Sequence, residues 1–423
     1  MKNNLTASLL LALTGLVLSC NNAGNEKTSD AAAKDSSATA KGPSKGAYGY
    51  DLQFLKSKGI NVLELQDKEG TAKVLLTPDY QGRVMTSTAD GDTGSSFGWL
   101  NYELISSGTK RKQFNPVGGE ERFWLGPEGG QYALYFKKGD SFNIAHWQVP
   151  ALIDTDKYQV LKADASEATF TKAATVTNYA GTRFDLEITR TIRLMDKTAL
   201  EQKLQTSLPA GVKVVAYESD NQVKNSGNTD WKKEKGLLSI WLLAMLTPTP
   251  RTAVIIPFKP VQHVKDYITD NYFGPVPSER LIVKDSVLYF NCDGKSRGKI
   301  GLSPKIAKSV AASYDYDRNA LTIIYFEVDK DGSYVNSKWE LQKEPFKGDV
   351  INAYNDGPLQ DGTQMGPFYE IESSSSAKEL AKGASMRYRQ TTCHFQGDYA
   401  AMSALALKVL GVELNEAKKL IIH

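Results

Sequence analysis

Cysteine and histidine are scarce in this sequence. The 423 residues include three cysteines and four histidines, with no Cys-x-x-Cys pair and no two histidines at metal-ligand spacing. A structural zinc site is therefore not expected. The sequence also has no dinucleotide fingerprint, P-loop, Gly-x-Ser-x-Gly elbow or internal repeat, which argues against the common nucleotide-binding, hydrolase and solenoid folds. We expect neither a metal nor a cofactor.

An excess of one charge is missing as well. Lysine and arginine number 51 against 48 acidic residues, so the formal net charge is +3. No stripe of basic residues alternates with aromatic residues, as nucleic-acid-binding surfaces usually show. We therefore do not expect nucleic acid as a partner. We also expect the protein to be a monomer.

Long apolar runs are limited to the beginning of the chain. The run from Leu9 to Leu18 follows Lys2 and is too short to span a bilayer. Residues 1–19 are therefore predicted to be a signal peptide. The sequence Val-Leu-Ser-Cys that ends at Cys20 resembles the lipobox of bacterial lipoproteins, whose cysteine is lipidated. The alternative is an ordinary signal peptide with an incidental cysteine.

The next segment has a composition that does not favour folding. Alanine is the only hydrophobic residue type in residues 21–47, so this stretch cannot bury enough apolar surface to form a core. Residues 20–47 are predicted to be a lipidated N-terminus and a flexible tether. The protein is then expected in the cell envelope, held by lipid to a bacterial membrane, in the periplasm or at the cell surface.

Residues 48–423 have the pattern of an all-β domain. Aromatic residues are plentiful, with 20 Tyr, 15 Phe and 6 Trp, as is common in sheets. In residues 184–194 apolar and polar residues alternate, except that Arg190 lies on the apolar side; this is typical of a half-buried strand. Further strands are predicted at 60–65, 72–77, 132–136, 168–171, 175–179, 213–219, 237–242, 253–257, 287–292 and 321–328. The pattern favours an antiparallel sandwich.

Two helices are expected at the edges of this domain. Residues 50–58 form a short one, and residues 398–410 have apolar residues at helical spacing with Gly411 as a stop signal. The two cysteines of the domain, Cys292 and Cys393, could form a disulfide in an oxidising compartment. Two buried free thiols explain them equally well.

Residues 118–131 combine five glycines with three glutamates, one arginine, one tryptophan and one amide. In a strand, Arg122 and Trp124 would point to one side. The following Gly-Pro-Glu-Gly-Gly turn would present Glu128. Such a mixture suits a site for a hydroxyl-rich ligand such as a sugar, although a sheet corner with a buried ion pair is a real alternative.

A second candidate segment lies near the end of the chain. Glu370 and Glu372 would share one face of a strand. Two close carboxylates repel each other, which can raise the pKa of one of them and make it a proton donor. The pair could equally bind a cation together with Asp356, or lie on a solvent-facing edge.

Two further segments have weaker signals. Asn221, Asn225 and Trp241 could line a pocket, although turn and core roles are more common for these residue types. The basic segment around Arg297 and Lys299 could bind an acidic sugar, but a solvated hairpin is the commoner structure.

Several segments together resemble a family of uncharacterised bacterial lipoproteins with a galactose-mutarotase-like fold. The resemblance covers nearly the whole of residues 48–423. It rests on residues 76–84, 118–131, 272–274, 352–358 and 368–377, and on the Gly-Ala-Ser turn at 383–385.

This resemblance implies an antiparallel β-supersandwich with short peripheral helices. In mutarotases a glutamate takes the proton of the anomeric hydroxyl and a histidine protonates the ring oxygen. Glu370 corresponds to that glutamate. The mutarotase histidine has no counterpart in residues 217–222, so His146 or His394 would have to replace it.

The sequence therefore predicts a membrane-anchored lipoprotein that binds or processes a carbohydrate. Glu370 and Glu128 are the candidate catalytic residues, and Glu370 would be the general base. The candidate sugar-binding residues are Arg122, Trp124, Gln131, Asn221, Trp241 and Glu372. The alternatives are an epimerase or hydrolase that uses Glu370 with a second acid, and a structural lipoprotein without a ligand.

Overall fold

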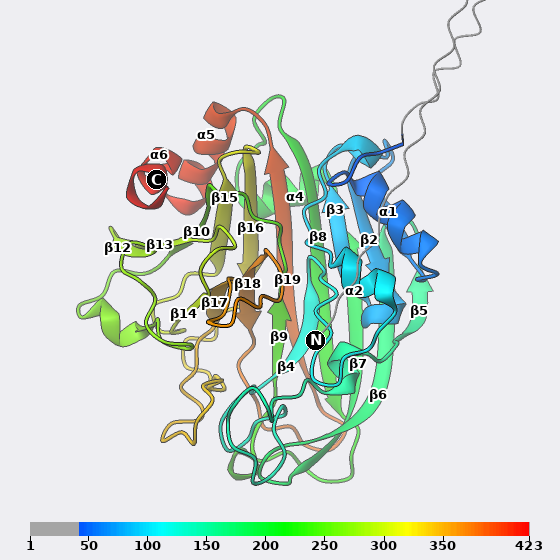
Figure 1. Ribbon diagram of the computed structural model, residues 1–423, viewed down its shortest axis with the longest axis vertical. Helices are drawn as coiled ribbons and strands as arrows, with labels where there is room; N and C mark the ends of the chain where they lie inside the picture. Colours follow the sequence, from blue (N-terminus) through cyan, green and yellow to red (C-terminus); the bar gives the residue numbers. More distant parts are fainter. Residues whose placement is uncertain (1–41, 423) are drawn as a thin grey trace, which may run out of the picture. The chain divides into compact units, whose positions relative to one another are not determined.

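The computed structural model describes residues 42–422, and most of the regular structure in this range is antiparallel sheet (Figure 1). The predicted signal peptide, the lipidated Cys20 and most of the predicted tether lie outside the described residues. No helix within 42–422 has the length and apolarity needed to cross a membrane.

The largest sheet has ten strands. Their order is β12 (Leu281–Lys284), β13 (Val287–Asn291), β10 (Thr252–Pro257), β15 (Val310–Asp315), β16 (Ala320–Phe326), β19 (Ser385–Gln396), β8 (Lys213–Asn225), β7 (Arg183–Leu194), β6 (Glu167–Thr177) and β5 (Gln159–Ala163).

A second sheet of six strands faces it. Its order is β11 (Ile268–Thr269), β14 (Gly298–Leu302), β17 (Ile351–Asn355), β18 (Tyr369–Ser374), β9 (Ser239–Leu243) and β4 (Arg122–Gly126). A small sheet contains β1 (Leu63–Gln66), β2 (Lys73–Thr77) and β3 (Arg83–Thr88).

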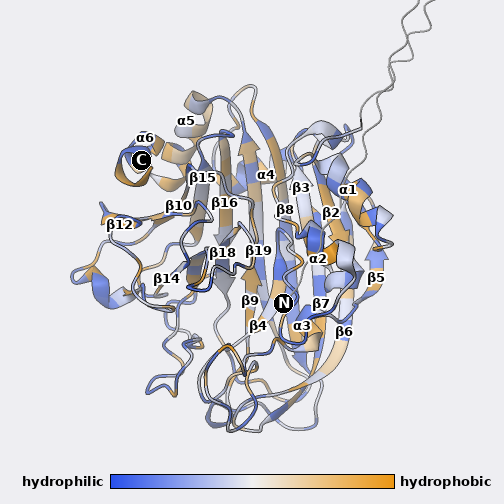
Figure 2. Ribbon diagram, viewed as in Figure 1, coloured by the Kyte–Doolittle hydropathy of each residue, from blue (hydrophilic) through white to orange (hydrophobic). Residues whose placement is uncertain are grey.

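The main core lies between the two large sheets. Ile240, Ile300 and Ile371 from the six-stranded sheet pack in one cluster with Val254 and Ile324 from the ten-stranded sheet. Figure 2 shows hydrophobic and hydrophilic residues alternating along many of the strands. This alternation is what a two-layer sandwich requires, because successive side chains of a strand point to opposite faces.

Helices cover the other face of the ten-stranded sheet. Apolar residues of α4 (Lys197–Leu204), α5 (Tyr399–Leu410) and α6 (Leu414–Ile421) form a second core with strands β10, β15, β16 and β19; α5 and α6 lie beside these strands in Figure 1. The side chain of Asp398 caps α5 at Ala401, and Gly411 ends it in a left-handed conformation.

The remaining helices are short. They are α1 (Tyr48–Ser57), α2 (Tyr102–Ser107) and α3 (Ala151–Asp154), with 3₁₀ turns η1 (Pro78–Tyr80), η2 (Gly91–Thr93), η3 (Lys233–Lys235) and η4 (Val264–Tyr267).

The all-β sandwich and both predicted helices are confirmed, but some elements differ from the sequence-based prediction. Residues 132–136 form no strand; Tyr135 and Phe136 are buried in a loop after the Gly129-Gly130 turn. The strands predicted at 168–171 and 175–179 form one continuous strand, β6.

The two cysteines of the domain are both free and buried. Cys292 belongs to the core between the two large sheets, and Cys393 belongs to the core under the helices. The ten-stranded sheet therefore separates the two thiols, and a disulfide between them does not form.

Candidate functional site

The site is built on one face of the six-stranded sheet. In the strand register Lys299 on β14 pairs with Tyr354 on β17, which pairs with Glu370 on β18. Paired residues on neighbouring strands project to the same face. The sheet therefore brings three residues that are far apart in the sequence into one polar row.

The next row continues across β18, β9 and β4. Leu243 on β9 pairs with Glu372 on one side and with Arg122 on the other, and Trp241 pairs with Trp124. Both glutamates of β18 thus face the same way as Arg122 and Trp124. The antiparallel register alone places the two candidate segments of the sequence side by side.

Glycines allow the chain to enter β4. A side chain at Gly118, whose φ is 98°, would bring its Cβ within 2.0 Å of the Trp99 carbonyl oxygen. The backbone therefore passes closely beside residue 99, and only glycine tolerates both the conformation and the contact. Some of the glycines in this segment thus serve the fold rather than a ligand.

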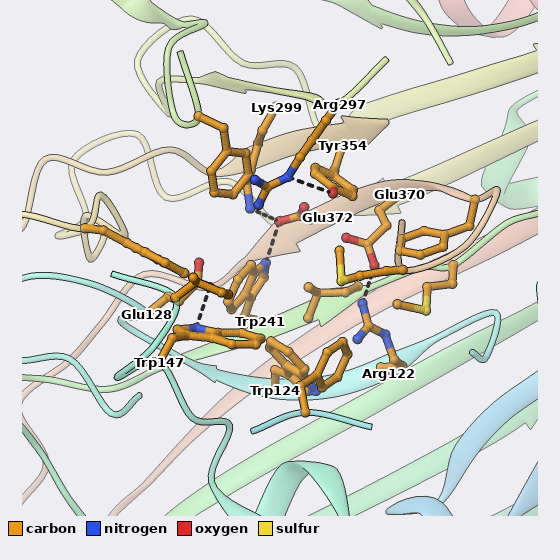
Figure 3. Close-up of a pocket in the computed structure, with 18 residues that line it drawn as sticks. Arg122, Trp124, Glu128, Trp147, Trp241, Arg297, Lys299, Tyr354, Glu370 and Glu372 are labelled. Carbon is orange, nitrogen blue, oxygen red and sulfur yellow. Dashed lines mark hydrogen bonds and ion pairs between the residues drawn. The ribbon is translucent and has the colours of Figure 1, made fainter. Parts of the chain in front are cut away.

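A cavity lies above this face of the sheet and is partly open to solvent; a water-sized sphere can occupy about 90 Å³ of it. Figure 3 shows the side chains around it. The lining residues are Phe114, Arg122, Trp124, Glu128, Ile144, Trp147, Trp241, Leu243, Met245, Phe273, Arg297, Lys299, Trp339, Tyr354, Met365, Phe368, Glu370 and Glu372.

Two ion pairs lie in the cavity wall. Arg122 binds Glu370 through one terminal nitrogen, and the ammonium group of Lys299 lies 2.7 Å from a carboxylate oxygen of Glu372. All four side chains are less than a tenth exposed. The other two nitrogens of Arg122, Nε and Nη1, are buried and have no partner within the described residues, so they remain able to donate hydrogen bonds.

Tryptophan N–H groups orient two of the carboxylates. Trp241 Nε1 donates to Glu372 Oε2 over 3.0 Å, and Trp147 Nε1 donates to Glu128 Oε1 over 3.0 Å (Figure 3). Each of these carboxylates keeps its other oxygen for a further partner. Because the indole rings are packed, the carboxylates are held in fixed orientations.

Burial changes the acidity of two of the glutamates. It raises the pKa of Glu128 to about 7, with Lys299 opposing this shift and Glu372 adding to it. Burial also raises the pKa of Glu370 to about 8, against the opposing effect of Arg122. Both carboxyls can therefore carry a proton near neutral pH.

Arg297 enters the cavity from the end of the sheet just before β14. Its guanidinium lies 3.9 Å from the centre of the Phe273 ring, and its Nε donates to the Tyr354 hydroxyl over 3.3 Å. That hydroxyl in turn donates to Asp356 Oδ1 over 2.5 Å. The guanidinium is thus held by an aromatic face and one hydrogen bond.

Aromatic rings form most of the apolar lining. Trp147 and Trp339 are stacked, with ring centres 5.9 Å apart and an interplanar angle of 26°. Trp339 is only half-buried. Trp124, in contrast, is 4% exposed, and its ring already has Trp241 at its edge and the Arg122 guanidinium at 4.9 Å. Trp339 therefore offers a ligand more ring surface than Trp124 does.

Six of the residues selected from the sequence come together in this cavity. They are Arg122, Trp124, Glu128, Trp241, Glu370 and Glu372.

Two other residues selected from the sequence, Gln131 and Asn221, do not line the cavity. The side chain of Gln131 exchanges two hydrogen bonds with the backbone of Gln342, at 2.9 and 3.0 Å, and so fastens one loop to another. Asn221 on β8 is fully buried and accepts a hydrogen bond from Arg190 over 2.7 Å. Asn225, considered with it, bonds to backbone carbonyls of Thr229 and Leu380 instead.

Neither proposed replacement for the mutarotase histidine lines the cavity. His394 is fully buried, with hydrogen bonds to Thr322 and Glu120 over 2.8 Å each. His146 is exposed to solvent. The residues that line the cavity therefore include no histidine.

A cation site formed by Glu370, Glu372 and Asp356 is not present. Glu370 is paired with Arg122 and Glu372 with Lys299, while Asp356 accepts a hydrogen bond from Tyr354. Among residues 42–422, no group of three or more His, Cys, Asp and Glu side chains is arranged to hold a metal ion.

The sequence analysis missed several aromatic residues of the site and favoured the wrong structure for the basic segment. Lys299 lies buried in strand β14, not in a solvated hairpin. Phe114, Trp147, Phe273 and Trp339 had not been selected. One signal was available: Trp339 follows Ser-Lys in a polar stretch. A tryptophan in such a stretch does not belong to a core strand, so another role could have been considered.

The chain belongs to a family without an assigned function: residues 46–421 match the Family of unknown function (DUF6786). No curated protein gives a significant match.

Solved structures provide remote likenesses. The chain is similar to the Slr1438 protein of Synechocystis (12% identity, 80% of this chain and 96% of that one, TM-score 0.49). It is also similar to a galactose mutarotase-like protein of Lactobacillus casei (10%, 79% and 100%, 0.47). A third is the GalM/aldose epimerase homologue of C. elegans (11%, 80% and 100%, 0.45).

Proposed function

We propose that this member of the DUF6786 family binds a carbohydrate in the cavity above the six-stranded sheet. The observation that carries the proposal is the joint presence of aromatic faces and oriented polar groups in one cavity. A sugar ring has an apolar C–H face and a rim of hydroxyls, so it needs both kinds of surface.

Each feature of the wall corresponds to one part of such a ligand. The half-buried Trp339 provides a face for the ring. The free oxygens of Glu128 and Glu372 can accept hydrogen bonds from hydroxyls. The unpartnered Nε and Nη1 of Arg122 can donate to hydroxyl or ring oxygens. Burying these groups without a ligand is costly, and a bound sugar would satisfy them.

Replacement of Trp339 tests the proposal. The wild type, Trp339→Ala and Trp339→Phe are compared on a glycan array, and each glycan that binds is measured by calorimetry. We expect Trp339→Ala to bind about tenfold or more weakly, since an aromatic contact contributes about 0.5–1.5 kcal/mol beyond area burial. Trp339→Phe keeps a ring and should retain most of the affinity.

The control is thermal unfolding of all three proteins, which shows whether the fold is intact. Absence of binding to any glycan by the wild type would overturn the proposal, as would equal binding by wild type and Trp339→Ala.

Processing of the sugar is a second candidate, favoured by the raised pKa values of Glu128 and Glu370. A protonated carboxyl can donate to a ring or glycosidic oxygen while an ionised one accepts a hydroxyl proton. Glu128 is the donor to test first, because Glu370 is held by the Arg122 guanidinium and Glu128 is not. The test is turnover of the bound sugar by wild type and Glu128→Gln: catalysis requires loss of turnover with binding largely retained.

The proposed place of action is a membrane surface. We propose that Cys20 is lipidated and that residues 21–47 hold the sugar-binding domain away from the lipid. Mass spectrometry of the mature protein, compared with Cys20→Ser, tests this. Acyl chains on Cys20 are expected in the wild type, and an unmodified or missing Cys20 in the membrane fraction would contradict the proposal.

A further inference from the structure

One cation in the cavity wall has no carboxylate in direct contact. Two cations are matched by carboxylates, in the pairs Arg122–Glu370 and Lys299–Glu372. The third cation, Arg297, has no carboxylate within 4.0 Å among the described residues. The third carboxyl, Glu128, accepts its hydrogen bond from Trp147. Arg297 therefore contributes a positive charge that no side chain neutralises by direct contact.

The two terminal nitrogens of the Arg297 guanidinium remain available to donate hydrogen bonds. Nε is occupied by the Tyr354 hydroxyl, and Phe273 stacks on the flat face of the guanidinium. The two terminal nitrogens have no hydrogen-bond acceptor within residues 42–422. A guanidinium that is fixed by stacking loses little entropy when it binds a ligand, and its parallel N–H groups match the two oxygens of a carboxylate.

Other charges around the cavity are compatible with an anion at this position. Lys299 on β14 and Arg297 just before this strand both line the cavity. Figure 3 shows Arg297 and Lys299 together on one side of the cavity, and Arg122 and Trp124 on the other. Asp356 is separated from Arg297 by the Tyr354 hydroxyl, which binds both.

The acidity of Glu128 also favours an anion near Arg297. Burial raises the pKa of Glu128 to about 7, so near neutral pH this carboxyl is only partly ionised. It therefore does not fully offset the charge of Arg297.

We propose that the sugar bound in this cavity is an acidic one, and that the terminal nitrogens of Arg297 bind the carboxylate of a uronic acid. The inference rests on the proposed sugar-binding function and specifies its ligand class. The sugar ring would then extend from Arg297 toward Trp241 and Trp339, with its hydroxyls near Glu372 and Glu128.

Matched pairs of sugars test this assignment. Binding of D-glucuronate and D-galacturonate is compared with that of D-glucose and D-galactose by saturation-transfer NMR and calorimetry on the mature protein. We expect the wild type to bind at least one uronate about tenfold or more tightly than the matched neutral sugar, since a charge-assisted hydrogen bond contributes about 1.5–3 kcal/mol. Higher salt should reduce this preference.

Three variants separate the contribution of Arg297 from a general charge effect. Arg297→Gln should lose the preference for the uronate and keep the affinity for the neutral sugar. Arg297→Lys retains the charge without the fork and should keep part of the preference. Arg251→Gln removes the same charge at an exposed residue that pairs with Asp317 outside the cavity, and should bind like the wild type.

The outcomes distinguish this inference from the function on which it rests. Equal binding of acidic and neutral sugars by the wild type, or an unchanged uronate preference in Arg297→Gln, would overturn the acidic-ligand assignment and leave sugar binding intact. A preference for sugar phosphates or sulfates over uronates would also overturn the carboxylate assignment. If no sugar of either kind binds, both proposals fail.

Discussion

Glu121 and Arg122 are neighbours at the beginning of β4, and each belongs to a different buried ion pair. The two pairs differ in how many of their hydrogen-bonding groups have partners. Glu121 pairs with Arg190 over 2.7 Å, and both side chains are fully buried. Arg122 pairs with Glu370 in the cavity wall. The two pairs share the same chemistry and almost the same position in the sequence, so they can be compared directly.

We call the Arg190–Glu121 pair closed, because each of its side-chain nitrogens and oxygens has a hydrogen-bond partner. The three guanidinium nitrogens of Arg190 donate to Gly82, Asn221 and Glu121, and the second oxygen of Glu121 accepts from Gln390. In the Arg122–Glu370 pair, two of the three guanidinium nitrogens have no partner in residues 42–422. A saturated pair fastens β7 to the segment before β4, whereas an unsaturated pair beside a cavity can accept a ligand.

The comparison shows that buried charge by itself does not mark a binding site. Buried ion pairs are often structural and contribute little net stability. What distinguishes the Arg122–Glu370 pair is the adjacent open volume, the aromatic lining and the donors that remain unused. Asn221 was selected from the sequence as a site residue, but it belongs to the closed pair.

Breaking the closed pair should have the largest effect on stability. Arg190→Met leaves the Glu121 carboxylate buried without its cation, and we expect a loss of about 3–5 kcal/mol in the free energy of unfolding. Arg122→Met should lose less, roughly 1–3 kcal/mol, because Glu370 can take up a proton. Urea unfolding of both variants at pH 7 measures the difference. Equal losses would show that the two pairs do not differ as described.

The dependence of stability on pH should reveal the carboxyls of the cavity. The pKa of Glu128 is raised from its ordinary 4.5 to about 7, so the folded protein holds this proton to higher pH than the unfolded chain does. The stability that comes from this proton is fully present below pH 4.5 and is lost as the pH rises through 7. Glu128→Gln lacks this proton equilibrium.

We therefore expect the wild type to lose roughly 1–3 kcal/mol more than Glu128→Gln between about pH 5 and pH 8. Urea unfolding at several pH values provides the measurement. Parallel curves for the two proteins would contradict the raised pKa of Glu128.

An exposed ion pair should have the smallest effect. Arg251 and Asp317 are paired at the surface, with side-chain exposures of 43% and 31%. Arg251→Gln should change the free energy of unfolding by less than about 1 kcal/mol, because solvent screens the pair. Thermal unfolding of Arg251→Gln, measured together with the wild type and Arg190→Met, tests this expectation. A loss as large as that of Arg190→Met would mean that burial does not account for the difference between the pairs.

Much of the fold could be predicted from local patterns. The alternation in residues 184–194 corresponds to strand β7, and Gly411 ends helix α5 as expected. Apolar and polar residues alternate in such a strand because its successive side chains face the core and the solvent in turn, so the pattern can be read from the strand alone. Residues 132–136 show the limit: four of the five are buried, but the backbone forms no strand there.

The site could be predicted only in part. Arg122 with Trp124, and Glu370 with Glu372, were selected because each pair lies on one side of a short strand. Trp147 and Trp339 lie in loops, and no periodicity in the sequence indicates which way a loop folds. Gln131 was selected for its neighbours in the sequence, yet its side chain binds the backbone of Gln342.

By itself, the sequence determined the alternation that makes the strands, the glycines that let the chain pass beside Trp99, and the types of side chain available for a site. The tertiary structure alone decided which of these side chains meet. The register of β14, β17, β18, β9 and β4 brings Lys299, Glu370 and Arg122 to one face. The tertiary structure also decided that both carboxylate oxygens of Glu121 have hydrogen-bond partners, while Arg122 and Arg297 keep unused donors. These partners come from distant parts of the chain, and only folding brings them within reach.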